Sequence, residues 1–152
     1  MANEIYANYS SSNTLYAVIR NRAGDIWYIL GQVFETWGTS GRDADDYDIA
    51  LTDKDGARYV GDFPAAITSA GRYGVQVFLQ AGANPAASDE LLASREIVWS
   101  GKAEVTAEKL LANKASQNKA SGEINYYDDD GQTVILTHTP DDGESSITRT
   151  PS

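Results

Sequence analysis

The residue types that carry most enzyme chemistry are scarce in this sequence, and the single histidine illustrates this. His138 lies in an alternating stretch of threonines and apolar residues, and there is no cysteine and no second histidine. A catalytic triad needs a histidine beside a nucleophile, and most zinc sites need further histidine or cysteine ligands. We therefore expect His138 to be a half-exposed strand residue. We expect no catalytic residue, no enzyme activity and no cofactor.

Two short acidic segments offer oxygen atoms that could bind calcium. They are Asp53–Gly56, with the sequence DKDG, and Asp128–Gly131, with the sequence DDDG. Neither segment continues into the ligand spacing of an EF-hand loop, which ends in a bidentate glutamate. Asp and Gly are also preferred in tight turns, because Asp caps backbone N–H groups and Gly accepts a positive φ. The sequence favours two turns and no metal site, with calcium binding as the alternative.

A small glycoside hydrolase is a further alternative, because the chain contains 22 Asp and Glu residues. Glycoside hydrolysis needs two carboxyl groups about 5–9.5 Å apart in a cleft, one of them with a raised pKa. The acidic residues of this chain occur instead in polar loops, which indicates solvated carboxylates. The glycines are dispersed as turn residues, so no phosphate-binding loop is predicted.

Three tryptophans are the remaining distinctive side chains. We expect Trp27 and Trp99 to fill the core, as buried tryptophans do in many β-sandwiches. Trp37 lies between Glu35 and Gly38, and its polar surroundings are equally compatible with burial and with exposure. Exposed aromatic rings beside polar loops often contact sugars or proteins. Trp37 and the loop 38–46 are therefore the candidate ligand surface.

Short β-strands must position these side chains. Runs of Val, Ile, Tyr and Trp alternate with Gly, Asp and Asn clusters about every ten residues, as in immunoglobulin-like sandwiches. We predict an immunoglobulin-like antiparallel β-sandwich over residues 14–101 and, before it, an aperiodic N-terminal arm over residues 1–13. The predicted strands are 15–20, 26–30, 32–37, 47–52, 58–63, 73–80 and 93–99.

The sequence changes character after the sandwich, and residues 102–152 form the third predicted segment. Thr106 is a suitable N-cap for a helix of about twelve residues, on which Ala107, Leu110, Leu111 and Ala115 form one apolar stripe. A β-meander follows, with turns at 128–131 and at 140–143. Residues 123–152 carry seven acidic groups against one basic residue, Arg149.

Neither part of this segment is expected to be stable alone. A short helix with one apolar stripe must dock on another surface, and a sheet of two or three strands is marginal in water. The meander must therefore lie against the helix, the sandwich or a neighbouring subunit. We predict that residues 104–152 supply the contacts between subunits. The interface candidates are Leu110, Leu111, Tyr126, Tyr127 and Leu136.

Charge restricts the partners of the chain. The formal net charge is -10, whereas nucleic-acid binding needs a surface of Lys and Arg, and anionic lipid repels an acidic chain. The N-terminus has no basic and apolar signal sequence, and no apolar run approaches the length of a membrane span. We expect a protein that is made in a cytoplasm and binds neither nucleic acid nor membrane.

Several segments of the chain resemble structural proteins of phages and prophages. The resemblance covers most of the chain from residue 14 onward and implies a role in a virion, in the tail, baseplate, fibre attachment or capsid surface. It implies copies arranged around a symmetry axis, as a trimer or a ring. It carries no catalytic motif. The segments that carry it are LYAVIR (15–20), GDIW (24–27), YDIALT (47–52), YVGDFP (59–64), EIVWSG (96–101), NKASGE (118–123), YYDDDG (126–131) and TRTPS (148–152).

The expected function is therefore a non-enzymatic structural component of a tailed-phage virion, which acts through homo-oligomeric assembly and contacts with other virion proteins. The alternative is a carbohydrate- or receptor-binding module that uses the surface around Trp37. A small hydrolase is the third hypothesis.

Overall fold

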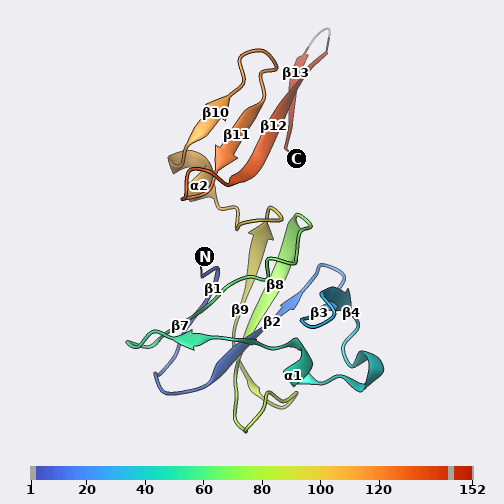
Figure 1. The fold of residues 1–152 in the computed structure, drawn as a ribbon, viewed down its shortest axis with the longest axis vertical. Helices are drawn as coiled ribbons and strands as arrows, with labels where there is room; N and C mark the ends of the chain where they lie inside the picture. The colour runs from blue at the N-terminus through green and yellow to red at the C-terminus, as the bar shows by residue number, and fades with distance from the viewer. Residues whose placement is uncertain (1–2, 144–145, 152) are drawn as a thin grey trace. The chain divides into compact units, whose positions relative to one another are not determined.

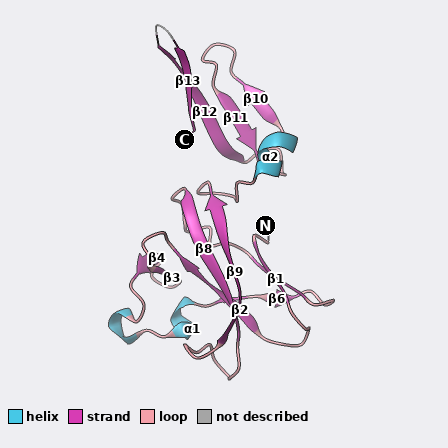
Figure 2. Cartoon of the chain, turned by 180° about the vertical axis from the view of Figure 1, so that it is seen from behind, coloured by secondary structure: helices cyan, strands magenta, loops and turns pink. Residues whose placement is uncertain are grey.

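The computed structural model describes residues 3–143 and 146–151, with the burial of side chains for residues 3–140. The fold is mainly β, with several antiparallel sheets and short helices, which confirms the predicted fold class. Figure 1 shows the course of the chain, and Figure 2 shows how little of it is helical. No helix in the described ranges has the length and apolar character needed to cross a membrane.

The elements follow one another as short strands with a few helical turns between them. In chain order they are β1 (Ile5–Asn8), β2 (Leu15–Arg20), β3 (Ile26–Tyr28), β4 (Val33–Glu35), the 3-10 helix η1 (Thr39–Gly41), α1 (Ala44–Tyr47), β5 (Ile49–Ala50), β6 (Thr52–Asp53), β7 (Arg58–Gly61), β8 (Gly71–Leu79), β9 (Glu90–Trp99), α2 (Ala107–Ala112), β10 (Ala115–Gln117), β11 (Ile124–Tyr127), β12 (Val134–Gly143) and β13 (Ser146–Pro151).

The chain divides into two compact units. Unit 1 contains residues 1–67 and 72–97, and unit 2 contains residues 68–71 and 98–152. The second unit thus contains the end of β9, from Val98, and a short segment that ends at Gly71, the first residue of β8.

Unit 1 is built from two antiparallel sheets. The larger has the strand order β4-β3-β2-β8-β9, with β5 also paired to β2, and the smaller has the order β1-β7-β6. The segment 49–53 joins them, because β5 pairs with β2 and β6 pairs with β7. At its middle, the Leu51 N–H donates to the carbonyl of Leu15 over 2.9 Å. One short stretch of chain therefore belongs to both sheets.

The strand β2 is buried on both faces. All five residues from Leu15 to Ile19 are buried, although successive strand side chains point to opposite sides. Tyr16 and Val18 belong to an apolar cluster with Ile26 and Tyr47. This cluster covers the face of β2 that carries the even-numbered residues, and it positions the site described below.

The two tryptophans predicted to be core residues are both buried. Trp27 in unit 1 is 4% exposed, and Trp99, at the end of β9 in unit 2, is 3% exposed. On β8, the alternating residues Tyr73, Val75 and Val77 are buried.

Two predictions for unit 1 are wrong in detail. The aperiodic arm contains β1, which pairs with β7 and buries Ile5 completely. The loop 38–46 contains η1 and the start of α1, whose N-cap Asp43 forms a capping box with Asp46. The acidic residues that suggested a loop are those that cap a short helix.

Unit 2 contains the predicted helix and meander, with different boundaries. The side chain of Thr106 accepts a hydrogen bond from the Lys109 N–H, which confirms the predicted N-cap. The helix ends at Ala112 and is half the expected length, because Ala115–Gln117 forms β10 and pairs with β11. The helix α2 lies against β11, so the meander and the helix dock on each other.

The predicted turn at 140–143 is wrong, because these residues belong to β12. β12 continues through Pro140 to Gly143 and pairs there with β13. Beyond His138, β12 no longer pairs with β11, so this part of the strand pairs only with β13. Proline is tolerated where a strand lacks a partner on one edge.

Candidate ligand-binding site

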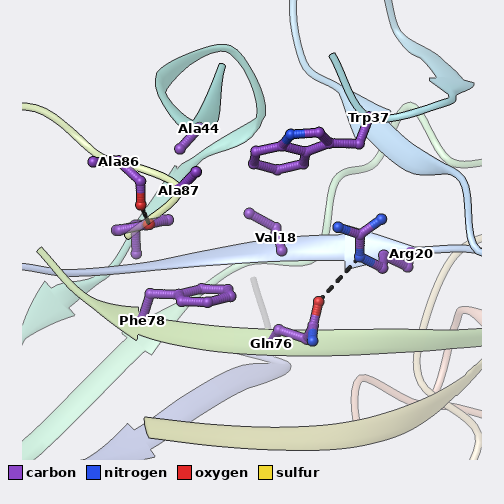
Figure 3. A pocket seen from close by; sticks show the side chains of 9 residues that line it. Val18, Arg20, Trp37, Ala44, Gln76, Phe78, Ala86 and Ala87 are labelled. Carbon is purple, nitrogen blue, oxygen red and sulfur yellow. Dashed lines mark hydrogen bonds between the residues drawn. The ribbon is translucent and has the colours of Figure 1, made fainter. Parts of the chain in front are cut away.

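A hollow of about 420 Å³ lies on the covered face of the larger sheet of unit 1. Its floor consists of β2 and β8, where Tyr16 is paired with Phe78 and Val18 with Gln76. Trp37 lies over Val18 and Arg20 on the other side of the hollow (Figure 3). The lining residues are Tyr16, Val18, Arg20, Trp37, Ala44, Gln76, Phe78, Ala86 and Ala87.

One end of the hollow is polar and offers hydrogen-bond donors. Arg20 Nε donates to Gln76 Oε1 over 3.1 Å, and Arg20 Nη1 donates to the carbonyl of Gly24 over 2.9 Å. Arg20 Nη2 and Gln76 Nε2 have no hydrogen-bond partner among the described residues. The guanidinium carbon lies 5.7 Å from the centre of the Trp37 ring, within the range of a cation–π attraction.

The other end of the hollow is apolar. Ala44, Ala86 and Ala87 form its wall, and the Phe78 ring lies along its floor (Figure 3). The Tyr16 and Phe78 rings stack with centres 5.4 Å apart. The hollow therefore offers apolar surface at one end and donors at the other.

An ion pair holds the loop that carries Trp37. Arg42 donates two hydrogen bonds of 2.6 Å to the two carboxylate oxygens of Glu35, and its guanidinium lies 4.1 Å from the centre of the Tyr28 ring. The pair closes the segment 36–41, where Gly38 and Gly41 take a positive φ of 78°. Such a two-point bond fixes orientation as well as distance.

Tyr47 also stabilises the loop that carries Trp37. Its hydroxyl donates to Glu35 over 2.9 Å and accepts from the Gly38 N–H over 3.2 Å. The rings of Trp37 and Tyr47 have centres 5.2 Å apart. The hydrogen bonds from Arg42 hold the pKa of Glu35 below its ordinary value. Burial and the hydrogen bond to Glu35 raise the pKa of Tyr47, so Glu35 is charged and Tyr47 neutral at neutral pH.

Asp89 holds the opposite rim. Its carboxylate accepts hydrogen bonds from the N–H groups of Ala81 and Ala86 and from the Tyr16 hydroxyl. The backbone N–H of Ala86, then that of Ala81, lowers the pKa of Asp89. Burial, followed by the hydrogen bond to Asp89, raises the pKa of Tyr16. Both rims of the hollow are thus tied by buried or half-buried hydrogen bonds.

Trp37, which is 40% exposed, and Ala44 are the two residues of the predicted ligand surface that line this hollow. Sequence reasoning missed their partners Arg20, Gln76 and Phe78. The signal that could have found them is the alternation in β2 and β8, which places these three side chains on the face opposite the main core.

The interface candidates lie in unit 2, on its helix and its meander. Leu111 is 88% exposed, whereas Leu110, Tyr126, Tyr127 and Leu136 are half-buried. The predicted strand residue His138 is also half-buried, and its ring meets that of Tyr126 edge-on, with centres 5.4 Å apart.

The acidic segments form turns. Asp130 accepts hydrogen bonds from the Thr133 hydroxyl and from the N–H groups of Thr133 and Gln132, which lower its pKa to about 2. Asp53 accepts from Ser12, Asp55 and Tyr59, and these bonds lower its pKa. Across the described part of the chain, no three Asp, Glu or His side chains form a metal-binding group.

Comparisons of the chain with models of known protein families, with curated proteins and with solved structures find no match.

Proposed function

We propose that this protein is a non-enzymatic structural component of a tailed-phage virion that assembles into a homo-oligomer through unit 2. The observation that carries the proposal is the poor burial of the helix and meander of this unit. Between residues 104 and 140, all of which are described, Ile135 is the only buried residue, at 3% exposure. A folded segment of this size normally buries several apolar side chains.

The apolar residues that remain uncovered support association between copies. Leu111 projects from α2 almost fully exposed, and Tyr126, Tyr127 and Leu136 on the meander are only half-buried. Aromatic and leucine side chains at such positions lose exposed surface when copies associate, and each fully buried side chain contributes about 1.5–3 kcal/mol. Assembly would therefore provide the core that unit 2 lacks.

Charge limits how the copies can meet. The chain carries a net charge of -10, so contact between like surfaces needs apolar area to outweigh repulsion. Lys109 and Asp128 pair within unit 2 at 2.6 Å, which neutralises one carboxylate beside the helix. The proposal thus places the apolar residues of α2 and of the meander at the interface.

Two leucines provide a matched test of this proposal. Leu111 in unit 2 and Leu30 in unit 1 are 88% and 82% exposed. Leu111→Asp should lower the solution mass of the full chain measured by sedimentation, whereas Leu30→Asp should leave it unchanged. An unchanged mass for Leu111→Asp, or a monomeric natural chain, would contradict assembly through this surface.

A truncated chain separates the two units in the same measurement. A chain that ends at Gly101 should sediment as a monomer. If it keeps the oligomeric state of the full chain, unit 2 is not the assembly region. The virion assignment has its own test, because the protein should be found by mass spectrometry in purified particles of the phage that encodes it.

The hollow beneath Trp37 favours a second function that is compatible with the first. A half-exposed tryptophan over a hollow with a polar and an apolar end is typical of a small-ligand site. In this second proposal unit 1 binds a carbohydrate or receptor ligand, while unit 2 holds the assembly together.

A further inference from the structure

We infer that the hollow beneath Trp37 binds a sugar ring that carries a carboxylate group. The inference rests on the second proposed function and specifies its ligand. It depends on the order of aromatic, donor and apolar surfaces within one site of unit 1.

The aromatic surface suits the flat, C–H-bearing face of a pyranose ring. Trp37 is 40% exposed and lies over the hollow, and Phe78 lines the floor (Figure 3). Aromatic rings carry a negative π face, which attracts the weakly positive C–H groups of a sugar. A ligand in the hollow beside the exposed part of Trp37 would therefore meet an aromatic face.

The polar end selects for an acceptor group, and in particular for an anion. Arg20 Nη2 and Gln76 Nε2 both donate, and neither has a partner among the described residues. The amide oxygen of Gln76 already accepts a hydrogen bond from Arg20 Nε. Arg20 Nη2 is a charged donor, and it suits a carboxylate because hydrogen bonds between charged groups are the stronger ones.

The apolar end of the hollow determines how a bound ligand is oriented. Ala44, Ala86 and Ala87 offer no side-chain hydrogen bond, so this end suits C–H or methyl substituents of the ring rather than hydroxyl groups. The volume of about 420 Å³ lies in the lower part of the range of small-molecule sites, about 300–1,000 Å³. This volume suits one or two sugar rings and excludes a long chain lying within the hollow.

The site is held in place before any ligand arrives. Glu35, Arg42 and Tyr47 fix the loop of Trp37, and Asp89 fixes the rim with Ala86. Binding to a preorganised site avoids the entropic cost of ordering loops.

The experiment uses the full chain and three small probes observed by ligand-detected NMR: methyl glucuronide, methyl glucoside and benzoate. Methyl glucuronide should bind, and methyl glucoside should bind about tenfold more weakly or not at all, because it lacks the charged acceptor. Benzoate carries the carboxylate on a flat aromatic body and tests whether the sugar is required.

Variants assign the binding to this hollow. Trp37→Ala and Arg20→Gln should each weaken methyl glucuronide binding by about tenfold or more. Arg22→Gln is the matched control, because Arg22 is exposed and lies two residues from Arg20 in the sequence. Gln76→Glu keeps the size of the side chain but places a negative charge against the Arg20 guanidinium, so it should also weaken binding. Each variant is first checked for an unchanged unfolding midpoint.

The outcomes separate the ligand class from the function. Equal binding of glucoside and glucuronide would overturn the requirement for a carboxylate. Binding of benzoate without either sugar would overturn the sugar class and leave a ligand site in place. Failure of all three probes to bind would overturn this inference, whereas the second proposed function, which includes receptor ligands, and the sedimentation tests of unit 2 would be unaffected.

Discussion

Glu35 and Arg42 decide how Trp37 is presented at the surface of unit 1. Their paired hydrogen bonds, both 2.6 Å long, close a loop that contains only polar residues and Trp37 itself. Tyr47 is fully buried and links this pair to the core through its hydroxyl group. A tryptophan in a free loop would turn onto any nearby apolar surface. Here the ion pair keeps it over the hollow.

The charge of Glu35 should contribute to stability in a pH-dependent way. Its pKa in the folded protein lies below the ordinary value of 4.5. The contribution of the carboxylate is therefore complete above that ordinary value and is lost as the pH falls through the lowered folded value. Glu35→Gln removes the charge and keeps the shape. We expect the natural protein to be more stable than this variant at neutral pH, and the difference to vanish in acid.

Urea unfolding of both proteins from neutral to acidic pH measures this difference. Asp53, Asp89 and Asp130 also have lowered pKa values, but they titrate in both proteins and cancel in the comparison. A difference that stays constant with pH would show that the Glu35 charge does not stabilise the loop.

At the scale of elements, β1 shows how a strand can form from an unremarkable segment. Residues 5–8 contain one large aliphatic side chain, Ile5, yet they pair with β7 from Ile5 opposite Gly61 to Asn8 opposite Arg58. The Glu4 carboxylate accepts a hydrogen bond from the Phe63 N–H over 3.0 Å. The pairing partner, rather than local propensity, makes this segment a strand.

Ile5 should therefore be a core residue rather than part of an arm. It has 0% exposure, and Ile→Ala in a core costs about 2–5 kcal/mol. We expect Ile5→Ala to lower the free energy of unfolding of the natural chain by an amount in this range. Urea unfolding followed by tryptophan fluorescence measures it.

Asn8 supplies the control for this prediction. It lies in the same strand but is exposed, so Asn8→Ala should change the free energy by no more than about 0.5 kcal/mol. Equal small effects of the two substitutions would show that β1 does not contribute to the core.

At the scale of the whole molecule, the two units differ in how much apolar surface they bury. Buried residues of unit 1 come from β1, β2, β3, β7, β8 and β9, whereas the described helix and meander of unit 2 bury little beyond Ile135. Local opening free energies follow buried contacts. Unit 2 should therefore depend on association for its stability, while unit 1 should not.

Hydrogen exchange at two protein concentrations tests this dependence. A tenfold increase in concentration should slow exchange in β11 and β12 by roughly three- to tenfold, because association removes the open form. The amides of β2 and β8 should exchange at the same rate at both concentrations. Leu111→Asp should remove the dependence. Equal exchange of β11 and β12 at both concentrations would contradict assembly through unit 2.

Local sequence patterns predicted the features that depend on neighbouring residues. The apolar runs in 15–20 and 73–80 predicted β2 and β8, Thr106 predicted the helix start, and Asp128–Gly131 predicted a turn. Each of these follows from side chains within a few positions of one another, so the sequence alone was sufficient.

Features that join distant segments depended on the tertiary structure. β10 is a strand because β11 lies beside it, although all three of its residues are exposed. The hollow was not predictable, because it combines β2, the loop of Trp37, β8 and the rim at Ala86. The sequence by itself determined the mainly β class, the acidic charge and a tryptophan in a polar loop. The tertiary structure decided that Arg20, Gln76 and Trp37 share one hollow, since pairing of strands far apart in sequence brings them together.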